Sequence, residues 1–96
     1  MKKDEILVAL KKYKQTNGGK YQIQRIGIFG SSVKDQMKAG SDIDIVVELG
    51  KQDLFFLIGI KQDLEERLHY PIDIVSYRKN MNQFLKNRID HEAIYV

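Results

Sequence analysis

The sequence predicts a small domain of the α/β (α+β) class, with a mixed sheet of about three core strands flanked by about four helices. Short segments rich in isoleucine and valine alternate with longer segments whose apolar residues recur at helical spacing. Gly, Asn and Pro separate the two kinds of segment. The chain has 96 residues, enough for one compact core and too few for two, so we expect residues 1–96 to form a single domain.

The helices are predicted from apolar periodicity and from capping residues. We expect one helix over 4–15, a short one from Ser31 to about Lys38 with Ser31 as its N-cap, a long one over 53–69, and a last one beginning near Asn80. The residues expected to face the core are Ile6, Leu7, Leu10 and Tyr13 in the first helix, Leu54, Leu57, Ile58, Ile60, Leu64 and Leu68 in the long helix, and Phe84, Leu85 and Ile89 in the last.

The strands are predicted where β-branched residues cluster. The first runs from Ile23 toward Gly30, and the second, over 42–49, is almost continuously apolar after its acids. Such a run is typical of a central strand that is covered on both faces. The third follows Pro71, because a missing N–H is tolerated at the start of a strand. The segment 93–96 is apolar and, with the last helix, is expected either to cover the open side of the domain or to dock a partner.

The composition excludes several classes of function. The chain has no cysteine, which excludes disulfides, thiolate zinc sites and cysteine nucleophiles and fits a cytoplasmic location. No apolar run approaches the roughly 20 residues of a membrane span, so no membrane association is expected. A net charge of +3 suits an anionic ligand but is too small to predict direct nucleic-acid binding. The basic residues near the last helix are expected on a solvated face, with contact to RNA or to an acidic partner as the alternative; they are Arg78, Lys79, Lys86 and Arg88.

Asp42 and Asp44 stand at the start of the second strand, after a turn that contains Gly30 and Ser31. Side chains alternate along a strand, so these two carboxylates point to the same side and repel each other. A divalent cation would relieve that repulsion. The simpler alternatives are a solvated strand end, an ion pair with lysine, and an ordinary turn at Gly30.

Asp73 adds a third carboxylate, between two isoleucines of the third strand. Because an unpaired buried carboxylate is costly, it needs a partner or a function. If this strand lies beside the second, the three acids converge at one edge, where they suit Mg²⁺ together with substrate phosphates. A glycine turn near a helix start suits phosphate, since the backbone N–H groups favour anions.

The ordered set of Gly30-Ser31, Asp42-x-Asp44 and a later Asp73 resembles the DNA polymerase β-type nucleotidyltransferase superfamily. Its minimal members, the MNT proteins, are similar in size, in the sequence of Ser41–Ile45 and in the sequence of the last segment, with Arg88 and Glu92–Val96. The resemblance extends over nearly the whole chain from Ile23 onward and implies a polymerase β-like fold.

The resemblance also implies roles for individual residues. Asp42 and Asp44 would hold Mg²⁺ and, through it, the triphosphate of ATP. Asp73 would ligate the catalytic metal and act as general base toward the acceptor hydroxyl. Gly30 and Ser31 would contact the β- and γ-phosphates. Lys34 stands where the family often has a basic residue, and Asp35 stands where it often has glycine.

Minimal members of the family pair with a HEPN-type RNase toxin in HEPN/MNT toxin–antitoxin systems. The resemblance therefore implies an antitoxin that transfers AMP from ATP to a hydroxyl of the toxin, with a tyrosine as the expected acceptor, a reaction known as AMPylation. Because few residues follow Asp73, we expect the acceptor side to be open and to be completed by a partner. The alternative is a binding module that masks the toxin's site, which the negative charge of Asp35 near the triphosphate would favour. A third class is transfer to a small molecule such as an aminoglycoside, which would require a homodimer.

Overall fold

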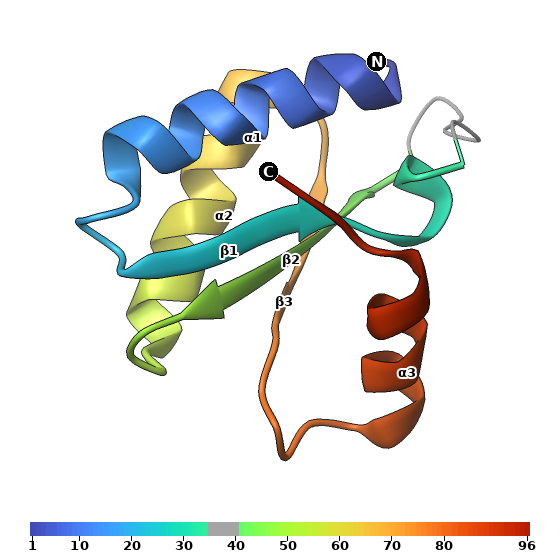
Figure 1. Cartoon of the computed structure of the whole chain (residues 1–96). Helices are drawn as coiled ribbons and strands as arrows, with labels where there is room; N and C mark the ends of the chain where they lie inside the picture. The colour runs from blue at the N-terminus through green and yellow to red at the C-terminus, as the bar shows by residue number, and fades with distance from the viewer. Residues whose placement is uncertain (35–40) are drawn as a thin grey trace.

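The computed structural model describes residues 1–34 and 41–96. Its elements are α1 (Lys3–Asn17), β1 (Ile23–Ile28), the 3₁₀ turn η1 (Gly30–Ser32), β2 (Ile43–Leu49), α2 (Leu54–Leu68), β3 (Ile72–Ser76), α3 (Gln83–Glu92) and β4 (Ile94–Tyr95). The strands form one sheet in the order β3-β2-β1-β4 (Figure 1). The predicted α+β class is confirmed.

The sheet is mixed. β1 pairs antiparallel with both β2 and β4, whereas β2 and β3 are parallel and are connected through α2. The apolar segment near the end of the chain is therefore a short strand, with Ile94 beside Ile28 and Tyr95 beside Gly27. A Cβ on Gly27 would overlap the carbonyl of Ile94, so glycine permits the close approach of β4.

The two faces of the sheet are covered unequally. Ile43, Ile45 and Val47 of β2 point to the face that carries α1 and α2, and they belong to the main core. Val46 points to the opposite face, where it joins a smaller cluster with Phe29 and with Ile89 of α3. Figure 1 shows α3 apart from the other two helices. The face beneath α3 is therefore the thinly covered one, as a site open to substrate requires.

Three details differ from the predictions. Phe84 is 89% exposed, Leu54 is 68% exposed and Ile58 is 43% exposed, so the periodicity of α2 and α3 overestimated the buried face. Asn82, not Asn80, caps α3 by accepting a hydrogen bond from Leu85 N (3.1 Å). Ser31 lies inside the 3₁₀ turn η1 and does not cap an α-helix. The remainder of that predicted helix, 35–38, lies outside the described residues.

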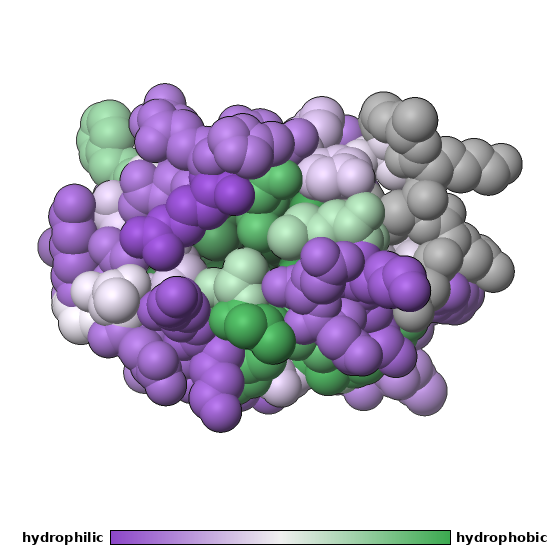
Figure 2. Space-filling model, turned by 90° about the horizontal axis from the view of Figure 1, so that it is seen from above, coloured by the Kyte–Doolittle hydropathy of each residue, from purple (hydrophilic) through white to green (hydrophobic). Residues whose placement is uncertain are grey.

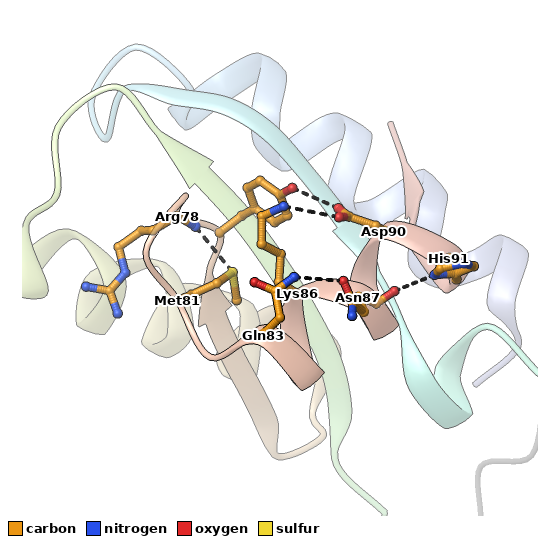
Figure 3. A network of polar contacts seen from close by, with 8 residues as sticks. Arg78, Met81, Gln83, Lys86, Asn87, Asp90 and His91 are labelled. Carbon is orange, nitrogen blue, oxygen red and sulfur yellow. Dashed lines mark hydrogen bonds and ion pairs between the residues drawn. The ribbon is translucent and has the colours of Figure 1, made fainter.

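Polar contacts attach α3 to the segment that follows β3 (Figure 3). The hydroxyl of Tyr77 donates to Asp90 (2.8 Å), which also contacts Lys86 (3.4 Å). On the same helix Gln83 donates to Asn87 (3.0 Å). These contacts are exposed and individually weak, but together with the burial of Ile89 they set the direction in which α3 runs across the sheet.

The surface seen from above is largely hydrophilic around a central hydrophobic strip (Figure 2). The longest helices, α1 and α2, have 15 residues each. Across 1–34 and 41–96, no helix combines the length and the apolar character needed to cross a membrane.

Candidate active site

Asp42, Asp44 and Asp73 lie together at one end of the sheet, on the face that carries α3. The parallel register places Asp44 directly beside Asp73. Asp42 precedes β2 and is exposed, as is Asp73, whereas Asp44 is partly buried. Burial raises the pKa of Asp44, and the negative charges of Asp73 and Asp42 raise it further. The three carboxylates therefore share one electrostatic environment, as the sequence predicted.

Gly30 adopts a backbone conformation, and packs at a distance from Asp44, that a residue with a Cβ would not tolerate. Its φ is +65°, a left-handed conformation that side chains with a Cβ rarely adopt. A Cβ at this position would lie 2.5 Å from Asp44 Oδ2 and 2.9 Å from a terminal nitrogen of Arg88. Gly30 thus lets the turn close over the carboxylate, and an alanine here would displace it.

The rest of the turn fixes Asp44 through backbone groups. Phe29 N–H donates to the Asp44 carbonyl (3.1 Å), and Asp44 N–H donates to Ser32 Oγ (3.1 Å). A backbone hydrogen bond from Ser31 reaches the Asp44 carboxylate and lowers its pKa, against the effect of burial. Ser32 is buried, so its role is structural, whereas Ser31 is half-buried.

The last two turns of α3 complete this end of the sheet. Glu92 Oε2 accepts a hydrogen bond from Gly30 N–H (3.1 Å) and forms an ion pair with Arg88 Nε (3.4 Å). The Arg88 guanidinium lies 5.7 Å from the centre of the Phe29 ring, and its charge lowers the pKa of Asp44. Arg88 was predicted on a solvated face. That prediction missed its contact with the site, although the spacing of Arg88 and Glu92 by four residues places both on one side of a helix.

The comparison with known proteins decides the family. Residues 9–96 match the model described as Polymerase beta, Nucleotidyltransferase. The chain belongs to this nucleotidyltransferase family.

Relatives of this nucleotidyltransferase resemble it over most of their length. MJ0435 of Methanocaldococcus jannaschii, to which protein adenylyltransferase activity is ascribed, is 40% identical over 78 residues, which are 80% of this chain and 83% of the relative. A solved structure ascribed to a minimal nucleotidyltransferase is 26% identical, with a TM-score of 0.78 over 98% of this chain and 95% of the other. The resemblance inferred from the sequence motifs is confirmed.

A third similarity is to a toxin–antitoxin complex. A solved complex of a tri-AMPylated Shewanella oneidensis HEPN toxin with an MNT antitoxin contains a chain of the same fold, with a TM-score of 0.71 and 20% identity. The match covers 97% of this chain and 70% of that one. At this identity, the similarity shows the fold alone.

The candidate nucleotide contacts of this nucleotidyltransferase differ in how they are placed. Gly30 and Ser31 adjoin Asp44, whereas Lys34 is exposed, with its N–H donating to the Ser31 carbonyl (3.2 Å). The N–H of Gly30 is already used by Glu92, so a phosphate at the turn would be met by its other donors. Asp35 lies outside the described residues.

The donor set fits a hard cation. Carboxylates are preferred ligands of Mg²⁺, which typically binds one or two of them and completes its shell with water and substrate phosphates. Among the described residues, no group of three or more His, Cys, Asp or Glu side chains is arranged so that it could hold a metal ion by itself. Asp42 and Asp73 are exposed, so phosphate oxygens can reach them from solvent.

Proposed function

We propose that the protein is a Mg²⁺-dependent adenylyltransferase that moves AMP from ATP to a tyrosine hydroxyl of a HEPN-type RNase toxin and acts as its antitoxin. The observation that carries this proposal is the pairing of Asp44 with Asp73 beneath a glycine turn that is closed by α3. Membership of the nucleotidyltransferase family and the activity ascribed to MJ0435 support the same reaction. The AMPylated toxin in the solved HEPN–MNT complex supports the partner and the antitoxin role.

The proposed roles follow from the position of each group. Asp42 and Asp44 hold Mg²⁺, which supplies charge neutralisation for the phosphates when bound. Gly30 would allow the close approach of the triphosphate to the η1 turn, Ser31 would contact the phosphates through its hydroxyl, and Lys34 would contribute long-range positive charge. Arg88, whose guanidinium lies beside Gly30, is placed to contact the same phosphates. Asp42, Asp44 and Asp73 are the proposed metal ligands and catalytic residues.

Asp73 is the proposed general base. It is the exposed acid on the strand farthest from the Gly30 turn, so an acceptor hydroxyl can approach it from solvent. The hydroxyl oxygen attacks the α-phosphorus of ATP, its proton passes to Asp73, and the bond to the β-phosphate breaks. Pyrophosphate leaves on the side of the Gly30 turn, and AMP remains on the acceptor oxygen.

The test is to incubate the protein with Mg-ATP and its HEPN-type partner and to record the intact mass of both. We expect the partner to gain the mass of AMP, and Asp44→Asn and Asp73→Asn to abolish the gain. Asp4→Asn, which removes an exposed carboxylate in the first turn of α1, serves as the matched control and should leave the gain unchanged. Neutralisation of the toxin without any mass gain would favour the masking function instead.

A metal titration tests the site independently of transfer. Addition of Mg²⁺ and a non-hydrolysable ATP analogue should raise the unfolding temperature of the wild type, because a ligand that binds only the native state stabilises it. Asp44→Asn should lose most of this response. An equal response in wild type and variant would contradict the assignment of Asp44 as a ligand.

A further inference from the structure

The outer edge of β3 is one of the two edges of the sheet, and no described strand pairs with it. β3 stands at the end of the order β3-β2-β1-β4. In a parallel pair, the backbone groups of alternate residues face the neighbouring strand, and Tyr77 N–H donates to Val47 O (2.7 Å) in this way. Counting back by twos from Tyr77, the backbone groups of Val75 and Asp73 also face β2, so the N–H and C=O groups of the intervening Ser76 and Ile74 point away from the sheet.

Only the first residues of this edge are blocked against pairing with another strand. Pro71 has no N–H, and Ile72 N–H donates to the carboxylate of Glu65 (3.0 Å). Within 1–34 and 41–96, no residue pairs with the outward groups of Ile74 or Ser76. Proteins usually block such an edge, because unpaired strand groups are a template for another strand. An edge left open beside a candidate active site is therefore suited to binding an extended peptide.

A groove of about 500 Å³ accompanies this edge, between the start of α2 and the start of α3. Its apolar lining includes Leu57, Ile74 and Leu85, and Arg78 adds a positive charge. Leu54 lines the same groove and is 68% exposed, and Phe84, beside Leu85 in the chain, is 89% exposed. Apolar surface of this extent gains free energy when a partner covers it. Arg78 favours a partner segment with an acidic residue.

The order of the strands places this edge on the acceptor side of the reaction. The Gly30 turn follows β1, which lies on one side of β2, whereas β3 lies on the other. Phosphates at the turn would therefore leave the β3 side of the acids free. An in-line displacement needs the attacking and leaving oxygens on opposite sides of the phosphorus, so the acceptor has to arrive from β3.

We propose that the acceptor protein docks an extended segment as an added strand on the outer edge of β3. This inference rests on the proposed function, because it says where the acceptor protein of that reaction binds. The apolar side chains of the segment enter the groove, and the residue that faces Asp73 projects to the same side of the sheet as Asp73. The acceptor hydroxyl is thereby brought to the carboxylate that takes its proton, and its oxygen bonds to the α-phosphorus as pyrophosphate leaves.

Two variants at one position test the added strand. Ser76→Pro removes an outward N–H while leaving the bonds to β2 in place, since proline is tolerated on an edge strand. Ser76→Ala keeps this N–H and loses the bond from Ser76 Oγ to Gln52 (2.9 Å), so it is the matched control. We expect Ser76→Pro to slow AMP transfer to the HEPN-type partner at least about tenfold relative to Ser76→Ala, with equal affinity for Mg-ATP. Equal transfer rates in the two variants would overturn the proposal.

Hydrogen exchange gives a measurement that does not depend on transfer. In the free protein the amide protons of Ile74 and Ser76 should exchange fast and that of Tyr77 slowly, and the partner should protect the first two. If the wild type transfers no AMP but these amides become protected, the proposed function fails and the docking inference stands. A partner that binds without protecting them would overturn the docking inference. So would protection that grows with protein concentration in the absence of the partner, because a second copy would then occupy the edge.

Discussion

Replacing Gly30 by alanine perturbs the site at its most constrained point. Alanine in a left-handed conformation costs about 1–2 kcal/mol. The new Cβ would also lie 2.5 Å from Asp44 Oδ2, closer than van der Waals contact permits, so the end of the Asp44 side chain would have to shift, which adds little to the cost. We expect the free energy of unfolding to fall by about 1–2 kcal/mol.

The measurement is equilibrium unfolding in urea at 25 °C, followed by a thermal scan. Each kcal/mol corresponds to a fall of about 4–8 °C in the unfolding temperature of a small domain. Gly19→Ala is the matched control, because a Cβ there would meet no atom within 4 Å. A Gly30→Ala variant within about 0.5 kcal/mol of this control, a difference typical of neutral surface changes, would refute the argument that the turn requires glycine.

Two further predictions concern charge and pH. Burial and the neighbouring Asp73 raise the pKa of Asp44, so the folded state favours the protonated carboxyl. The protonated carboxyl therefore stabilises the folded protein fully below about pH 4, and this stabilisation is lost as the pH rises through the pKa of Asp44 in the folded state. Asp44→Asn should therefore unfold at a higher urea concentration than the wild type at pH 7 without Mg²⁺, with a smaller difference near pH 4; a wild type that is more stable at pH 7 would contradict this. Burial, with a hydrogen bond to Asp63 (2.7 Å), raises the pKa of Tyr13 above its usual range. The contribution of the neutral Tyr13 hydroxyl to the free energy of unfolding is therefore full below about pH 10 and is lost in more alkaline solution. Tyr13→Phe should lower the free energy of unfolding by about 1 kcal/mol at pH 7 and flatten the decline above pH 10, and an unchanged alkaline slope would argue against the assignment.

The parts of the fold that depend on local pattern were predictable. The alternation of side chains along a strand predicted that Asp42 and Asp44 share one side. The pairing of β2 with β3, which brings Asp73 beside Asp44, was only a condition of the prediction and is set by the fold. The helix 54–68 followed from its apolar spacing, and Asp53 caps it by accepting a bond from Phe55 N–H (2.8 Å). These features are set by periods of 3.6 and 2 residues, which a sequence displays directly.

The parts of the fold that depend on contacts between distant residues were not predictable from the sequence. Glu92 accepts a hydrogen bond from Gly30, 62 residues away in the chain, and no local sequence pattern around either residue predicts this contact. β4 has two residues, too few for a period to be visible. Phe84 was expected inside because it lies near Leu85 and Ile89, but α3 buries a narrow strip and turns Phe84 to solvent. In each case the packing of separate elements, not local propensity, decides the outcome.

The bond between Glu92 and Gly30 also sets an order of events in the cell. Chains are made from the N-terminus at roughly 5–20 residues per second, so Gly30 leaves the synthetic machinery several seconds before Glu92 exists. Throughout that interval the turn beside Asp44 lacks the helix that holds it. Such a long-range closure is among the slower steps of folding. The candidate site therefore matures late, after β1, β2, β3 and most of the main core can already have formed.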